Sequence, residues 1–396
     1  MTPRLAWLFS VAAGTAVANL YWSQPLLSAI ADDLGIASHR ASWVLTLVQL
    51  GYAVGILLIL PLGDVANRRR MVPMMIASSA LALVAVAVAP TMGVLLVVMS
   101  VLGITAIAGQ LLVPLAGDLS PDDKRGEYVS TVTAGILIGI LLSRTLAGFI
   151  ADLAGWRVVY LVAAVVAGVL AVVMFTQLPD LPPQQKLGYP ALMRSVLRII
   201  TSHSTLRWTM ALGMLGFGTF TLFWTALTFL LSSEPYSYSL TQIGSFGLAG
   251  LAGALASRRV GVLHDRGHSV PATGAMWLLA LLVWVGVGIG GRSLAVLIVA
   301  VVLIDVALQG QMILNQIRLF ALSDAERSRL NSVFVTFNFL AAAVGSAAAG
   351  ALWNWGGWTA VTVAGAAGSL AALVVWLLGR RGPLQEPAAS DLRRAQ

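Results

Sequence analysis

The sequence is poor in charge and has no cysteine. Only 10% of its 396 residues are charged and 58% are hydrophobic, whereas a soluble domain carries about 25% charged residues. This composition excludes a water-soluble fold. Without cysteine there is no disulfide, thiolate nucleophile or cysteine-ligated metal. Two lysines, Lys124 and Lys186, and four scattered histidines form no phosphate-binding loop or metal-ligand pattern. We therefore expect no enzyme, no cofactor and no metal.

Long apolar runs take up most of the chain. They continue for about 18–25 residues without the alternation of barrel strands. Because backbone groups must be paired inside the hydrocarbon core, such runs predict helices. The sequence predicts an all-α membrane protein with twelve transmembrane helices, at about residues 6–29, 42–62, 71–89, 92–116, 129–150, 157–177, 208–231, 239–257, 270–290, 293–317, 330–352 and 358–379.

The basic residues indicate the orientation of these spans. Most of the 24 Lys and Arg residues fall at the chain ends and in loops on one side of the membrane. Only Arg40, Arg157 and Arg292 fall in loops on the other side. Short cytoplasmic loops retain Lys and Arg, so both termini are predicted to be cytoplasmic. Orientation also explains the net charge of +8, and we expect no nucleic-acid partner.

Similar landmarks recur about 200 residues apart, which indicates a parallel repeat of two halves. Asp64 corresponds to Asp265, Gly109-Gln110 to Gly310-Gln311, and Gly155-Trp156 to Gly357-Trp358. We predict two six-helix halves, 1–178 and 208–380, with a cytoplasmic linker, 179–207, and a cytoplasmic tail, 381–396. The linker begins in a proline-rich turn and is expected to hold a short amphipathic helix carrying Arg194 and Arg198.

Polar side chains inside the spans are the candidates for function, because an ionisable group at membrane depth costs about 2.5–3.5 kcal/mol. We interpret Arg144, in the fifth span, as a ligand of substrate or coupling ion, and Asp305, in the tenth, as a proton carrier. The alternative is a structural Arg–Asp pair that locks the halves together. Uncharged groups are expected to complete a substrate cavity: Tyr21, Gln24, Gln49, Tyr52, Gln110, Trp224, Gln309 and Asn338. For each of these the alternative is helix packing or a hydrogen bond between helices.

Small residues recur at every fourth position of the fifth span: Gly135, Gly139, Ser143 and Ala147. Such a stripe lets two helices approach closely. We expect it to form a packing seam on which the two halves rock, not a ligand site.

The loop between the second and third spans has the sequence Gly63-Asp64-Val65-Ala66-Asn67-Arg68-Arg69-Arg70. With twelve spans in two halves, it resembles the signature of the major facilitator superfamily, in which Gly precedes Asp-Arg-x-Gly-Arg-Arg. Matched at Asp64, the arginines fall on Arg68 and Arg69. Val65 replaces the usual Arg, and Asn67 replaces a Gly whose left-handed conformation Asn can adopt. The resemblance implies a cytoplasmic gate of Gly63, Asp64, Arg68 and Arg69, with a weaker second copy at Asp265 and Arg266.

Other stretches are similar to bacterial efflux members of the drug:proton antiporter branch. They are Asn19 to Leu27, Gly51 to Gly55 with Pro61 to Asp64, and Gly135 to Gly148. Relatives in that branch export purine nucleosides, sugars and drugs. The arginine usual in the branch's fourth span falls on Met99 here, so proton coupling is expected to be arranged differently.

The resemblance implies a secondary active transporter that works by alternating access. We expect a monomer in the bacterial inner membrane that exports a small organic molecule in exchange for protons. The alternatives are a proton-coupled importer or a uniporter of the same fold, and a membrane receptor that does not transport.

Overall fold

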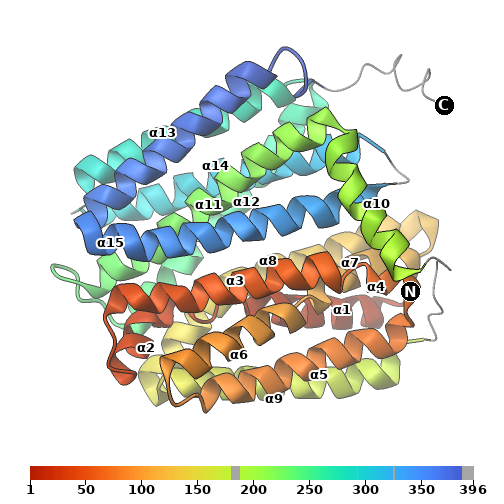
Figure 1. Cartoon of the computed structure of the whole chain (residues 1–396), viewed down its shortest axis with the longest axis horizontal. Helices are drawn as coiled ribbons and strands as arrows, with labels where there is room; N and C mark the ends of the chain where they lie inside the picture. Colours follow the sequence, from red (N-terminus) through yellow and green to blue (C-terminus); the bar gives the residue numbers. More distant parts are fainter. Residues whose placement is uncertain (180–187, 292, 324–325, 386–396) are drawn as a thin grey trace. The chain divides into compact units, whose positions relative to one another are not determined.

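Every regular element that the structure describes is a helix (Figure 1). The computed structural model describes residues 1–179, 188–291, 293–323 and 326–385, so most of the predicted linker turn and tail lie outside it. The α-helices are α1 (Pro3–Ala18), α2 (Leu27–Asp33), α3 (Ser42–Leu58), α4 (Leu62–Val65), α5 (Arg68–Ala87), α6 (Met92–Thr105), α7 (Ala108–Asp118), α8 (Arg125–Ala154), α9 (Trp156–Gln177), α10 (Tyr189–Ser202), α11 (Ser204–Ser232), α12 (Leu240–Asp265), α13 (Ser269–Gly290), α14 (Leu294–Phe320) and α15 (Arg327–Gly379). The 3-10 helices are η1 (Gln24–Leu26), η2 (Ser38–Ala41) and η3 (Asp122–Lys124).

Nine stretches of the described chain are long and apolar enough to cross a membrane. One of them lies in α15, where Gly356 and Gly357 have non-helical backbone angles. The two parts of α15 therefore correspond to the spans predicted at 330–352 and 358–379. With α12 covering the eighth span and α1–α2 the first, the helices are consistent with twelve spans. The predicted all-helical class is confirmed.

Large apolar side chains cover the outside of these helices. Leu81, Val165, Val172 and Ile289 each expose 67% or more of their surface. Scattered exposed apolar residues are normal in soluble proteins, but a whole row of them on α9 is not. Contact with lipid tails accounts for this exposure.

Two predicted spans are not continuous helices. The first was expected at 6–29, but α1 ends at Ala18 and the chain turns before η1 and α2. Pro25 cannot donate a backbone hydrogen bond, and Asn19 accepts one from the Trp22 indole within the turn. The fourth was expected at 92–116, but Ala106 and Ile107 separate α6 from α7.

Helix starts follow local capping chemistry. The hydroxyl of Thr2 accepts from the backbone N–H of Leu5 ahead of Pro3, the first residue of α1. Asn67 caps α5 in the same way, through its side-chain oxygen and the N–H of Arg69. Its backbone angles, φ −73° and ψ 107°, are extended, so Asn67 does not use the left-handed conformation that asparagine can adopt. A side-chain cap, not a special backbone angle, explains asparagine at this position.

The chain divides into two compact units. The first comprises Met1–Leu192, Trp224–Leu248 and Ser346–Ala351, and the second Met193–Phe223, Ala249–Gly345 and Leu352–Gln396. In the first unit α1 packs along α8, α3 along α6, and α5 along α9. In the second, α13 packs along α14. The predicted division into sequence halves remains a prediction.

One pair of glycines makes the same kind of backbone contact in each of the two units. In the first unit a Cβ on Gly139 would lie 2.3 Å from the carbonyl oxygen of Gly14. In the second unit a Cβ on Gly345 would lie 2.2 Å from that of Gly218. Each pair lets two helix backbones touch where any side chain would hold them apart.

The small-residue stripe of α8 does not act as expected. Gly135 and Gly139 face α1, where a Cβ on Gly135 would lie 2.3 Å from the carbonyl oxygen of Ser10. Both helices belong to the first half of the sequence, so the interpretation of this stripe as a seam between halves is wrong for these glycines. Spacing alone predicts close packing but does not identify the partner helix.

The linker contains the expected short helix, α10. Its buried side chains, Leu192, Val196 and Ile199, lie on one face, and Arg194 and Arg198 are exposed. The hydroxyl of Tyr189 donates to the carbonyl of Leu58, which attaches the start of α10 to the end of α3.

Candidate functional site

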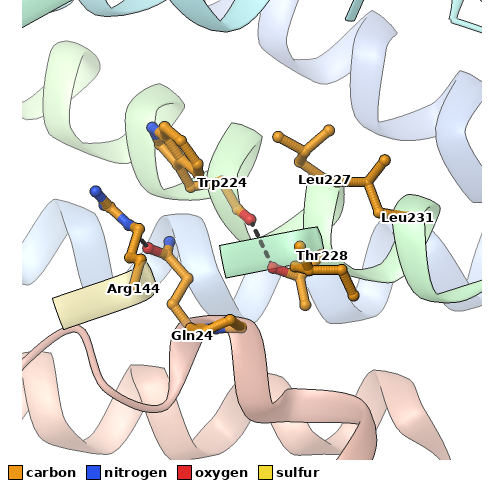
Figure 2. A pocket seen from close by; sticks show the side chains of 8 residues that line it. Gln24, Arg144, Trp224, Leu227, Thr228 and Leu231 are labelled. Carbon is orange, nitrogen blue, oxygen red and sulfur yellow. Dashed lines mark hydrogen bonds between the residues drawn. The ribbon is translucent and has the colours of Figure 1, made fainter. Parts of the chain in front are cut away.

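A small pocket in the first unit contains three of the predicted cavity residues. It is lined by Gln24, Pro25, Arg144, Trp224, Leu227, Thr228, Leu231 and Ile243 (Figure 2). Its volume of about 10 Å³ holds about one water molecule. The side chains of these residues therefore leave little free space in the pocket.

Arg144 is the centre of the pocket. It lies on α8 and exposes 2% of its surface. Its Nε donates to Oε1 of Gln24 over 2.5 Å, and its guanidinium carbon lies 4.3 Å from the centre of the Trp224 ring and 5.0 Å from that of Tyr21. Cation–π contacts of this kind stabilise a desolvated guanidinium by about 2 kcal/mol. The structure thus brings together Arg144, Tyr21, Gln24 and Trp224, four of the residues predicted to line a substrate cavity, and their role in binding stays a prediction.

One face of α11 forms the opposite wall. Trp224, Leu227, Thr228 and Leu231 follow helical spacing (Figure 2). The Thr228 hydroxyl donates to the carbonyl of Trp224 one turn back, so its proton points at its own helix. Apart from this hydroxyl, the wall offers the pocket an indole ring and two leucines.

Helix α12 touches α8 directly behind Arg144. A Cβ on Gly244 would lie 2.4 Å from the carbonyl oxygen of Arg144, and one on Gly247 would lie 3.2 Å from the Arg144 Cβ. Further along, a Cβ on Gly148 would lie 2.1 Å from the carbonyl oxygen of Leu240. These three glycines, which we call the α8–α12 seam, determine how closely the two helices approach.

The first turn of α12 is held to α8 by a carboxylate. Asp152 accepts from the backbone N–H groups of Leu240 and Thr241, at 3.2 and 2.7 Å. Ser239 and Gln242 also cap this end reciprocally, each side chain accepting from the other's backbone N–H. Negative charge at a helix N-terminus stabilises the helix, so Asp152 strengthens the contact between α8 and α12.

The other uncharged candidates of the first unit form separate pairs. The amide of Gln110 donates to the Tyr52 hydroxyl over 3.2 Å. Gln49 accepts from the hydroxyl of Ser346, which is also 2.8 Å from the hydroxyl of Thr46. These bonds are what the packing alternative describes, and none of these residues lines the pocket.

Asp305, Gln309 and Asn338 belong to the second unit. Asp305 is 1% exposed on α14, and its Cβ would be 2.7 Å from a Cβ on Gly253 of α12. Gln309 follows one turn later and is half-buried. Asn338 is fully buried on α15 against Gly213, and neither of its amide atoms has a hydrogen-bond partner among the described residues.

The predicted cytoplasmic gate is described in part. Arg68 is 6% exposed, and its guanidinium donates to the carbonyl of Gly63 at 2.6 Å and to the carboxylate of Asp118 at 2.7 Å. Arg69 and Arg266 are exposed. The side chains of Asp64 and Asp265 lie outside the description, so the gate remains a prediction.

The sequence reading missed three residues. Asp118, the partner of Arg68, is the last residue of α7, and Asp152, at the seam, lies in the last turn of α8. A carboxylate at the end of a span resembles ordinary loop charge. Arg318 was counted among the basic residues of a cytoplasmic loop, but it is 2% exposed and donates to Thr273, Asn315 and the carbonyl of Leu384. The sequence signal for the burial of Arg318 is its position three residues after Asn315, another polar residue of the same helix.

Comparisons with known proteins identify the family of the chain. The family model of the Major Facilitator Superfamily matches residues 9–317. The chain belongs to the major facilitator superfamily. The uncharacterized transporter YgaY of Escherichia coli O157:H7 is 38% identical over 379 residues, which cover 96% of each chain.

Solved structures show the same fold at low identity. A bacterial homolog of the human lysosomal transporter Spinster has a TM-score of 0.78 at 12% identity, over 98% of this chain and 100% of its own. The nucleoside transporter NupG has a TM-score of 0.75 at 13% identity, over 95% of this chain and 99% of its own. The superfamily member described here is therefore a multi-pass membrane transporter and not an enzyme.

Proposed function

We propose that this chain is a proton-coupled exporter of a small organic molecule in the bacterial inner membrane, with both termini cytoplasmic. The observation that carries the proposal is Arg144, a buried cation that lies against Gln24, Tyr21 and Trp224 and lines a pocket. A guanidinium at membrane depth costs several kcal/mol, so an arginine retained there is a candidate for a functional role. Because the pocket has a volume of only about 10 Å³, the site has to open for a substrate to enter.

Asp305 is the proposed proton carrier. It is a carboxylate in the middle of an apolar span, buried to 1% exposure. Intramembrane carboxylates mark proton relays in transporters. A proton taken up on the outer side and released to the cytoplasm would drive export of the substrate in the opposite direction.

Inside-out membrane vesicles test direction and coupling together. A compound first found by a thermal-shift screen is offered outside vesicles whose lumen is acidified, and its accumulation is measured. An exporter accumulates the compound and loses it when a protonophore collapses the gradient. A proton-coupled importer instead expels the compound from vesicles that were preloaded with it, a uniporter ignores the pH gradient, and a receptor moves nothing in either experiment.

Two variants assign the residues. Asp305→Asn should lower gradient-driven accumulation at least about tenfold while the compound still binds. Arg144→Ala should abolish binding of the compound. Asp33→Asn, an exposed carboxylate change, serves as the control and should transport normally. Gradient-driven export by Asp305→Asn at the normal rate would remove Asp305 from the coupling mechanism.

A further inference from the structure

Two polar side chains in the pocket have hydrogen-bonding capacity that their own contacts do not use. Gln24 is the first residue of η1 and Thr228 lies on α11, so they come from two different walls (Figure 2). Gln24 is 4% exposed and Thr228 is 3% exposed. Native proteins rarely leave buried polar atoms without a partner, so the unused atoms of these two residues are candidates for contact with a ligand.

The unused atom of Gln24 is its amide nitrogen. The guanidinium of Arg144 only donates hydrogen bonds, so the amide atom that meets its Nε is the oxygen, Oε1. The nitrogen Nε2 carries two N–H groups, and neither donates to a residue that the structure describes. Gln24 therefore offers the pocket a donor, whatever other bonds Arg144 makes.

The unused capacity of Thr228 is that of an acceptor. Its hydroxyl donates its single proton to the carbonyl of Trp224 at 3.2 Å. A hydroxyl oxygen also has two lone pairs, and within the described part of the chain nothing donates to those of Thr228. The wall opposite Gln24 therefore offers the pocket an acceptor.

We infer that the substrate carries a hydroxyl group, which binds between Gln24 and Thr228. This inference rests on the proposed transport function and names the chemistry of the substrate. A hydroxyl oxygen accepts from Gln24 while its proton is donated to Thr228, so one group satisfies both walls. A carbonyl or carboxylate group only accepts and an ammonium group only donates, so each would leave one wall unpaired. The pocket volume of about 10 Å³ fits one oxygen atom.

The part of the substrate next to this hydroxyl should be apolar. Pro25, Leu227, Leu231 and Ile243 complete the lining of the pocket, and contact with them is favourable because it removes apolar surface from water. Water has the same donor and acceptor chemistry as an alcohol and is the alternative occupant. Only an alcohol also gains the apolar contact, so matched organic compounds separate the two.

Three indole compounds test the hydroxyl group. Tryptophol donates and accepts through its side chain, its methyl ether only accepts, and 3-propylindole does neither. Binding to the purified full-length protein in lipid nanodiscs is measured by isothermal titration calorimetry, and empty nanodiscs control for partition into lipid. Tryptophol should bind about tenfold more tightly than either of the other two compounds, because they leave one or both buried walls unpaired.

Variants of the two walls have different expected effects, so each is informative even if the other fails to fold. Thr228→Val removes the acceptor, and tryptophol should lose its preference over the methyl ether. Gln24→Glu removes the donor but keeps an oxygen for Arg144, so the methyl ether should lose affinity while tryptophol still donates to Thr228. Thr219→Val is the matched control and should retain the preference. Thr219 also lies on α11 and donates to a carbonyl one turn back, that of Leu215 at 2.6 Å, but it does not line the pocket.

Three results would overturn the inference. They are equal binding of the three compounds, which would assign the pocket to water alone, a preference for tryptophol that survives Thr228→Val, and no binding of tryptophol at all. The proposed transport function is judged separately, by the vesicle assay. Export of a compound without a hydroxyl group there would leave the transporter intact and refute only the substrate chemistry.

Discussion

The buried amide of Asn338 offers a test of whether a polar residue inside a span serves transport or helix packing. Its amide is fully buried beside Gly213, and no described residue bonds either amide atom. An unsatisfied buried amide costs about 1–3 kcal/mol. A transporter keeps such a group when some state of its cycle, or its substrate, uses the amide.

Replacing this amide with an apolar side chain of similar shape should therefore stabilise the protein. Asn338→Leu is expected to increase the free energy of unfolding by about 1 kcal/mol or more, and so to raise the unfolding temperature. It should also lower the transport rate. Thermal unfolding in detergent and vesicle transport measure the two effects.

The control is Asn19→Leu. Asn19 is as buried as Asn338, but its side-chain oxygen accepts from the Trp22 indole. This variant should lower the unfolding temperature. If Asn338→Leu destabilised the protein as much as Asn19→Leu, the amide of Asn338 would be structural.

A second residue-scale prediction concerns pH. The guanidinium of Arg157 donates to the carboxylate of Asp33, and this hydrogen bond holds the pKa of Asp33 below its ordinary value. Because the folded pKa is the lower one, the pair stabilises the protein fully above an ordinary pKa of about 4, and the stabilisation disappears as the pH falls through the lowered value.

The unfolding temperatures of the unmodified protein and of Asp33→Asn should thus differ near neutral pH and converge as the pH falls below the ordinary pKa of a carboxyl group. Both side chains are more than one-third exposed, so the difference is worth less than about 1 kcal/mol. Asp32→Asn controls for the loss of surface charge. A gap that widened on acidification would contradict the assignment.

At the scale of elements, the α8–α12 seam depends on its glycines. A Cβ on Gly148 would lie 2.1 Å from the Leu240 carbonyl oxygen, where ordinary contact begins at 3.4 Å. Gly148→Ala should therefore force the helices about 1 Å apart. The cysteine-free chain accepts spin labels at Ala154→Cys and Ser245→Cys, and the distance between them should lengthen.

Gly168→Ala is the matched control, because no atom lies within 4 Å of a Cβ there. It should leave the label distance unchanged and should raise the unfolding temperature slightly, because alanine favours a helix interior over glycine. Gly247→Ala should have an intermediate effect, since its Cβ would lie 3.2 Å from that of Arg144. An unchanged distance in Gly148→Ala would show that the seam is not set by backbone contact.

Helix breaks and helix partners were the parts of the fold that the sequence did not predict. Span positions follow from apolar length, which the bilayer imposes on each segment independently. The turn at Asn19–Ser23 and the pairing of Gly139 with α1 depend on the neighbouring helix instead. Periodicity identifies a close-packing face but carries no information about what packs against it.

At the scale of the molecule, the signature loop predicted the superfamily, which is confirmed, and intramembrane polarity predicted residues that the structure brings together. Arg144, Tyr21, Gln24 and Trp224 were named from polarity and aromatic character, and they converge. The sequence did not single out Asp118, Asp152 and Arg318. Charged residues at span ends can serve orientation, helix capping or buried contacts, and the sequence does not distinguish these roles. The wider set of cavity residues and the coupling of Asp305 remain predictions.

Arg318 has a practical consequence for protein engineering. Its Nε donates to the carbonyl of Leu384, whose side chain is fully buried, so the residues just beyond α15 belong to the folded body. A C-terminal affinity tag or fluorescent fusion should therefore be attached after Gln385. Joining it at the end of the last helix would remove this carbonyl and cost the protein part of its folding yield.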